Sequence, residues 1–231
     1  MRLIRFVPDI DNKELMLLEP TPAKEHIPEW YRKGESAVDM GPGQDQHSGM
    51  KSCAPFLDVM LTGYCLVTPF DIYVGKNQDG TQNVRWNGPQ EWGKFIEERP
   101  TSLGATIPRP AGYGPNGLVW ASKWGWKTPR GWSTLVCHPL NQHQLPFITL
   151  AGTIESDKFI ACGNIPFFLQ KDWFGVIPAG TPYAQIIPFK RKSWKKIADY
   201  GLYRVAKKQG EQVRKQDKSY KKALWVRKDY N

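Results

Sequence analysis

The fold class is decided by four short apolar stretches in the second half of the chain: Ser-Thr-Leu-Val-Cys (133–137), Pro-Phe-Ile-Thr-Leu (146–150), Asn-Ile-Pro-Phe-Phe-Leu (164–169) and Tyr-Ala-Gln-Ile-Ile-Pro (183–188). Each has the length and the β-branched or aromatic content of a strand. Turn-forming residues such as Pro139, Gly163 and Gly180 separate them. Strands at this spacing predict a mainly β fold, a sandwich or barrel of short antiparallel strands.

The first half of the chain adds further elements. Pro55 occupies a favoured first helical position, which predicts a short helix over 55–61. A strand is expected over 64–74. Asp79-Gly80 then has the chemistry of a hairpin turn leading into the next strand, 82–86.

The positive charge is concentrated at the C-terminal end. The net charge is +10, yet residues 190–231 alone hold 15 lysines and arginines against four acidic side chains, so the rest is nearly neutral. We therefore predict a β-rich domain with long irregular loops over 1–189 and a basic helical tail over 190–231. Apolar residues at three- and four-residue spacing predict a tail helix that begins near Ser193 and breaks at Gly210.

Two interpretations of the tail remain open. Its apolar stripe docks on the body and its lysines form a solvated face, or its cations form a surface for nucleic acid or an acidic partner. The second interpretation assigns the basic surface to Lys190, Arg191, Lys192, Lys195, Lys196, Lys207 and Lys208.

Four tryptophans fall within residues 120–132, and cations including Arg130 interleave with them. Tryptophans alternating with cations suit an interface or a platform for stacked bases. The alternative is that some of these rings point into the core. The candidate binding residues are Trp120, Trp124, Trp126, Arg130 and Trp132.

Two polar groups are further candidates. His138, Asn141 and His143 would line the mouth of a barrel and bind a small polar ligand, or they belong to a plain surface turn. Glu155 and Asp157 are two apart and face the same side of an extended segment. They would share a metal ion or a proton, or they decorate a loop.

Several functional classes lack their motifs. The chain contains no Gly-rich phosphate loop, no Gly-x-Ser-x-Gly and no His-Glu-x-x-His. The four cysteines form no Cys-x-x-Cys pair, so we expect buried free thiols, no metal and no cofactor. No apolar stretch is long enough to span a bilayer, so we expect no membrane contact and a location in the cytosol or inside a particle.

Residues 152–157 (Gly-Thr-Ile-Glu-Ser-Asp) and 179–187 (Ala-Gly-Thr-Pro-Tyr-Ala-Gln-Ile-Ile) resemble, in order and separation, two segments of the dUTPase family. The resemblance implies a β-clip fold, and because β-clip relatives are often trimers, a possible homotrimer. Glu155 stands where that family has the aspartate that orients the attacking water. The family's Pro-Arg-Ser-Gly phosphate motif and Gly-rich C-terminal lid have no counterpart here.

A wider set of motifs is similar to an uncharacterised family of tailed bacteriophages, including the T4-like and cyanophage groups: residues 53–58, 62–64, 127–133, 138–141, 145–147 and 180–189. This resemblance implies a virion component or a host-takeover factor. Our preferred hypothesis is a non-enzymatic phage-type structural or interaction protein whose basic tail contacts acidic partners, nucleic acid or neighbouring subunits. The alternatives are a dUTPase-like nucleotide-binding protein or Mg²⁺-dependent nucleoside triphosphate hydrolase, and a small-ligand binding barrel.

Overall fold

The computed structural model describes residues 3–9, 18–39, 41–42, 47–100, 102, 107–114, 117–160, 162–215 and 219–229. The contacts group the chain into two units. The first is Met1–Ala23 with Gly63–Arg191, and the second is Lys24–Thr62 with Lys192–Asn231. The sequence analysis placed residues 24–62 in the body, whereas these contacts group them with the C-terminal residues.

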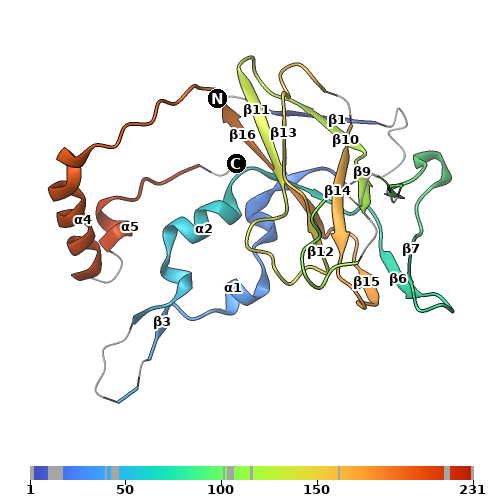
Figure 1. The fold of residues 1–231 in the computed structure, drawn as a ribbon, viewed down its shortest axis with the longest axis horizontal. Helices are drawn as coiled ribbons and strands as arrows, with labels where there is room; N and C mark the ends of the chain where they lie inside the picture. The colour runs from blue at the N-terminus through green and yellow to red at the C-terminus, as the bar shows by residue number, and fades with distance from the viewer. Residues whose placement is uncertain are drawn as a thin grey trace. The chain divides into compact units, whose positions relative to one another are not determined.

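The first unit is built on a five-stranded antiparallel sheet with the strand order β13-β11-β16-β5-β2. Strands β11, β13 and β16 of this sheet can be followed in Figure 1. Its strands are β13 (Gly152–Ile154), β11 (Trp132–Cys137), β16 (Pro182–Lys190), β5 (Tyr64–Val67) and β2 (Thr21–Pro22). The longest pairing joins β11 to β16, from Trp132 opposite Lys190 to Cys137 opposite Gln185. This register places the end of β16 beside the start of β11.

Three smaller antiparallel sheets lie in the described part of this unit. One has the order β12-β14-β9-β8, another β15-β6-β7, and the third pairs β1 with β10. Their bounds are β12 (Phe147–Thr149), β14 (Asn164–Leu169), β9 (Leu118–Ala121), β8 (Ile96–Glu98), β15 (Gly175–Ile177), β6 (Ile72–Lys76), β7 (Gln82–Trp86), β1 (Arg5–Pro8) and β10 (Trp124–Lys127), with a 3₁₀ turn at Gln90–Trp92.

The core of this unit lies between the five-stranded and the four-stranded sheets. Leu66, Val136 and Ile186 come from the first sheet, and Trp120 and Phe167 come from the second. The predicted mainly β class is confirmed. The sheets are arranged as a sandwich, and the described strands do not close into a barrel.

The second unit contains the four α-helices whose bounds the structure describes. They are α1 (Glu29–Lys33), α2 (Ala54–Leu61), α4 (Tyr203–Lys215) and α5 (Ser219–Ala223), with 3₁₀ turns at Ala23–His26, Met50–Ser52 and Tyr200–Leu202 and a small pair of strands, β3 (Ala37–Val38) and β4 (His47–Ser48). In the part of the chain that the structure describes, no helix is both long and apolar enough to cross a membrane.

Several local predictions are confirmed. The helix predicted over 55–61 is α2, with proline in its first turn. Gly63, which follows it, has a φ of +77°, and a Cβ there would lie 2.1 Å from the Ile186 carbonyl oxygen, so only glycine fits. The hairpin at Asp79-Gly80 joins β6 to β7 as expected. The strand expected over 64–74 is divided into β5 and β6.

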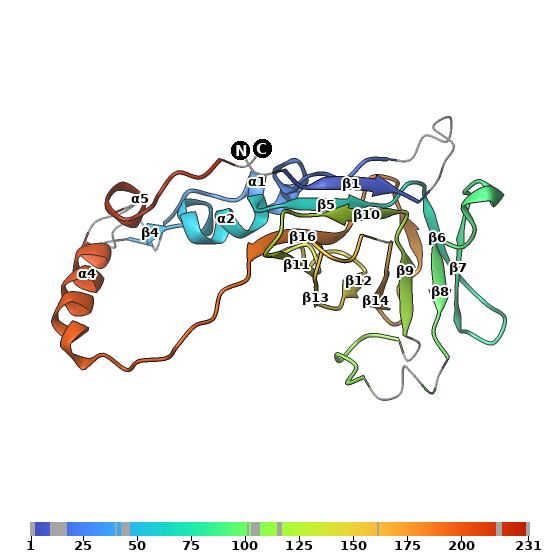
Figure 2. The same ribbon diagram turned by 90° about the horizontal axis from the view of Figure 1, so that it is seen from above.

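The predicted start of the tail helix is wrong. Residues 192–199 are irregular (Figure 2), Asp199 accepts a hydrogen bond from the Gly201 N–H, and α4 begins only at Tyr203. Trp194 is 91% exposed, so the apolar stripe has no surface to pack against. Helical spacing without such packing does not stabilise a short helix in water. Gly210, the predicted break, lies inside α4.

Candidate functional site: an arginine–carboxylate cluster and a basic arm

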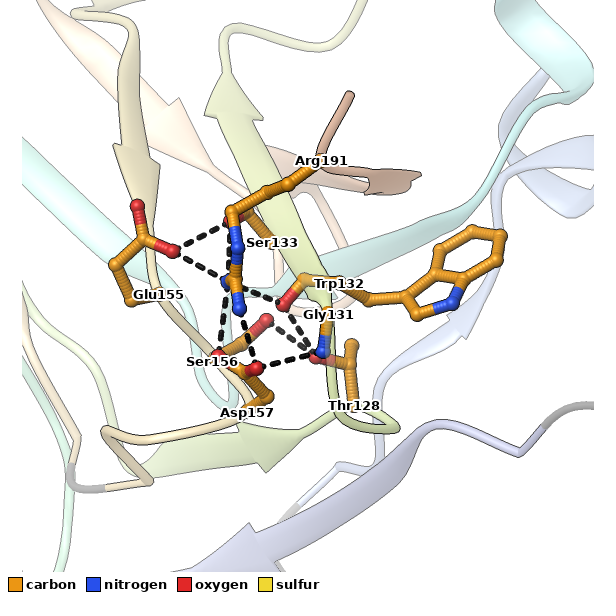
Figure 3. Close-up of polar contacts among 8 residues, drawn as sticks. All are labelled: Thr128, Gly131, Trp132, Ser133, Glu155, Ser156, Asp157 and Arg191. Carbon is orange, nitrogen blue, oxygen red and sulfur yellow. Dashed lines mark hydrogen bonds and ion pairs between the residues drawn. The ribbon is translucent and has the colours of Figure 1, made fainter. Parts of the chain in front are cut away.

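A polar cluster forms where three segments of the five-stranded sheet meet (Figure 3). Arg191 directly follows β16 and therefore lies beside the start of β11, which carries Ser133. Glu155 and Asp157 follow β13, which pairs with β11 on its other side. Strand pairing thus brings both carboxylates to one guanidinium, 34 or more residues away in sequence.

Asp157 is the most strongly held member of the cluster. Its Oδ1 accepts from Arg191 Nη1 at 2.8 Å, and its Oδ2 accepts from Arg191 Nη2 and from the Gly131 N–H at 2.8 Å. Its side chain is only 4% exposed. The hydrogen bonds from Arg191 and Gly131 hold the pKa of Asp157 well below its usual range. Asp157 in turn raises the pKa of Arg191.

Glu155 completes the cluster from a more exposed position. Its Oε2 accepts from Ser133 Oγ at 2.8 Å and from Arg191 Nη1. Arg191 Nη1 also donates to the Trp132 carbonyl oxygen at 3.0 Å. Both carboxylates therefore face the same side, as predicted, but they share a guanidinium. No group of three or more His, Cys, Asp or Glu side chains suited to a metal ion occurs among the described residues.

The position of Arg191 corrects its assignment to the basic surface. Its side chain is about one-third exposed and is committed to Asp157 and Glu155. Glu155, which the dUTPase resemblance assigns to water activation, serves here as one of the acceptors that hold Arg191. The ion pair between Arg191 and Asp157, together with the hydrogen bond from the Gly131 N–H to Asp157, connects the 128–131 turn to the 155–158 turn.

The tryptophan cluster divides between core and surface. Trp120 is fully buried, stacks on Phe167 with ring centroids 3.9 Å apart and donates from Nε1 to Thr149 Oγ1 at 3.2 Å. Trp126 is also buried and donates to Thr134 Oγ1 at 2.8 Å. These two belong to the core and not to a binding surface, because buried rings cannot reach a ligand.

The other residues of this segment are more accessible. Trp124 is half-buried and donates from Nε1 to the Leu18 carbonyl oxygen at 2.9 Å. Trp132 is half-buried, and its ring points away from the arginine cluster (Figure 3). Arg130 is exposed.

The predicted histidine group belongs to a turn. His138 Nδ1 accepts from the Thr149 N–H at 3.3 Å, and its Nε2 lies 3.1 Å from the Gln142 carbonyl oxygen, to which the neutral ring donates. Burial lowers the pKa of His138, which favours that neutral form. Asn141 has a φ of 61°, a turn conformation, and His143 is exposed. His138 therefore holds strand β12 in place, which corrects its assignment to a ligand site.

The cysteines follow the prediction only in part. Cys65 and Cys137 are buried free thiols, and burial raises the pKa of Cys137 to about 11. Cys162 is half-buried, with a pKa raised to about 11 by the same cause. Cys53 is exposed, contrary to expectation.

We define residues 192–208 as the basic arm. Its cations Lys192, Lys195, Lys196, Arg204, Lys207 and Lys208 are all exposed and form no ion pair with another described residue. Lys190, just before the arm, is exposed as well. The arm also exposes Trp194 and Ile197, which the sequence analysis placed on the apolar stripe of the tail helix, and Tyr200. Tyr200 lies off that spacing, and the sequence analysis did not single it out.

The C-terminal end of the second unit is attached to α2. Trp225 Nε1 donates to Asp58 Oδ2 at 3.0 Å, and Lys228 pairs with the same carboxylate. The Lys221 and Lys228 ammonium groups also lie over the Trp225 ring. This attachment joins segments 167 residues apart and had no signal in the sequence.

We compared the chain with protein-family models and with curated proteins. Neither a protein-family model nor a curated protein matches the chain.

Proposed function

We propose that the protein is a non-enzymatic interaction protein that binds single-stranded nucleic acid through its basic arm. The observation that supports this most is the charge of the arm, six exposed cations against Asp199 as its only acidic residue. Unpaired lysines and arginines attract phosphates and release their counterions.

The exposed aromatic residues favour a single strand over a duplex. Trp194 and Tyr200 are 91% and 89% exposed, and lysines flank Trp194. Bases of a single strand stack on such rings while cations follow the backbone. Residues 1–189 are nearly neutral, so another copy of the body offers the arm no matching acidic charge. The phage-type structural role stays a prediction.

The test is the salt dependence of binding to a labelled 20-nucleotide single strand, measured by fluorescence anisotropy. For single strands the logarithmic slope is roughly −0.7 per neutralised phosphate. A variant with alanine at Lys195, Lys196, Lys207 and Lys208 should weaken binding and make the slope shallower by about 3.

The control variant removes the same charge elsewhere, with alanine at Lys24, Lys33, Lys94 and Lys171, all exposed and outside the arm. It should retain most of the affinity of the wild type. Equal losses in the two variants, or no binding by the wild type at low salt, would refute the proposal. A duplex bound as tightly as the single strand would refute the stacking role of the aromatic residues.

A further inference from the structure

A groove of about 910 Å³ opens beside the arginine–carboxylate cluster, within the first unit. Its described lining residues include five basic side chains and one acidic one, Asp157. The basic residues are Arg5, Lys127, Arg130, Lys158 and Arg191. Asp157 is already neutralised by Arg191. The other four cations are exposed and form no ion pair with another described residue, so the groove carries excess positive charge.

Two of these cations are cross-strand neighbours. In the pairing of β1 with β10, Arg5 lies directly opposite Lys127. Residues directly opposite in an antiparallel pair project from the same face, and like charges there are destabilising. Like charges therefore lie on neighbouring strands of this unit, and a bound anion would relieve their repulsion.

The other two cations are positioned by the cluster. Arg130 precedes Gly131, whose N–H donates to Asp157 Oδ2 at 2.8 Å, and Lys158 follows Asp157. The Lys158 N–H donates to the Glu155 carbonyl oxygen at 2.8 Å. The hydrogen bonds between the 128–131 turn and the 155–158 turn therefore fix the backbone from which Arg130 and Lys158 project, before any ligand binds.

The geometry points to a phosphate-binding site in this groove. None of the described lining residues is aromatic, so these residues offer no platform for a base and would recognise a ligand through its phosphates. Its volume is enough for a chain of several phosphates. The phosphates belong to a free polyphosphate-bearing molecule or to the backbone of a nucleic acid. Four of the five cations lie far from the basic arm in sequence, so this site does not depend on the function proposed for the arm.

The probe for the site is inorganic tripolyphosphate, measured by isothermal titration calorimetry with the full chain. The double variant Arg130→Ala/Lys158→Ala should bind it at least about tenfold more weakly, since it removes two charged hydrogen-bond donors. The control Lys94→Ala/Lys171→Ala has the same net charge as the groove variant and should bind tripolyphosphate like the wild type. The four-lysine variant of the arm should also bind like the wild type.

Two results would overturn the site: no binding of tripolyphosphate by the wild type, or equal affinity in the groove and control variants. A second variant tests the repulsion without a ligand. Lys127→Gln should raise the melting temperature in phosphate-free buffer and lower the affinity for tripolyphosphate, and a lowered melting temperature would contradict the argument.

The labelled single strand identifies the source of the phosphates. If the groove takes a nucleic-acid backbone, the groove variant weakens oligonucleotide binding and tripolyphosphate competes with the strand. If it takes a free polyphosphate, the oligonucleotide binds the groove variant and the wild type equally. Loss of oligonucleotide binding in the arm variant alone leaves the groove intact, so the two proposals fail separately.

Discussion

Asp157 and Glu155 are two residues apart, yet their surroundings differ. Asp157 is almost fully covered and receives hydrogen bonds from Arg191 and the Gly131 N–H, whereas the Glu155 side chain is 56% exposed. The donors stabilise the ionised form of Asp157 in the folded state only, so its lowered pKa links folding to pH.

We predict that Asp157→Asn lowers the free energy of unfolding at neutral pH. The folded-state pKa lies below the unfolded value of roughly 3.9. The stabilisation is therefore fully present above that value and is lost as pH falls toward the folded pKa. Chemical denaturation should show a difference in the free energy of unfolding between wild type and variant that is constant from pH 7 to pH 5. This difference should become smaller below pH 4.

Asp172→Asn is the matched control for that measurement. Asp172 is an exposed turn residue whose ion pair with Lys171 spans 3.9 Å, and exposed pairs contribute little. If the free energies of unfolding of the wild type and Asp157→Asn differ by the same amount at every pH, the charge of Asp157 does not stabilise the fold.

Trp120 and Trp194 should respond in opposite ways to truncation. Trp120→Ala removes a fully buried ring that stacks on Phe167, which costs about 3–5 kcal/mol. Trp194→Ala removes a ring that is 91% exposed, and the change in stability should stay within about 0.5 kcal/mol. Thermal unfolding measures both. A large loss for Trp194→Ala would show that its ring packs against the protein.

Among the elements, α4 departs most from its prediction. It runs through Gly210 and shows a strongly one-sided distribution of polar and apolar residues. Gly210 is not among the glycines with positive φ. Glycine inside a helix is unfavourable relative to alanine because it loses more backbone freedom on folding.

We therefore predict that Gly210→Ala stabilises α4, by roughly 0.5–1 kcal/mol of helix free energy. Far-UV circular dichroism should show increased helicity, and backbone chemical shifts should stay helical from residue 207 to residue 213. If Gly210 instead ended the helix in a left-handed conformation, alanine would be strained and helicity would fall.

At the scale of the whole molecule, charge and packing are separated along the chain. The sandwich core and the groove belong to Met1–Ala23 and Gly63–Arg191, while the basic arm belongs to the other unit. Residues 192–199 are exposed and irregular, and their amides donate no backbone hydrogen bond to a described residue. Such a segment opens without unfolding the core.

We predict that trypsin first cleaves the native protein after Lys192, Lys195 or Lys196. Mass spectrometry of early time points should find a resistant N-terminal fragment that ends at one of these residues. Lys127, which is paired in β10, should be cut much later. A first cut between residues 63 and 191 would contradict this assignment of the exposed segment.

The sequence by itself determined the features that depend on neighbouring residues: the short strands, the proline-initiated helix α2, the Asp79-Gly80 hairpin and the charge of the C-terminal region. The residue preferences of turns and the alternation of polar and apolar residues act over a few positions, so they can be recognised within one segment of the sequence. Only the tertiary structure decided that Arg191 pairs with Asp157, that Trp120 is core, that Trp194 is exposed and that Arg5 faces Lys127. Those outcomes depend on strand register and burial, which segments distant in the chain establish together.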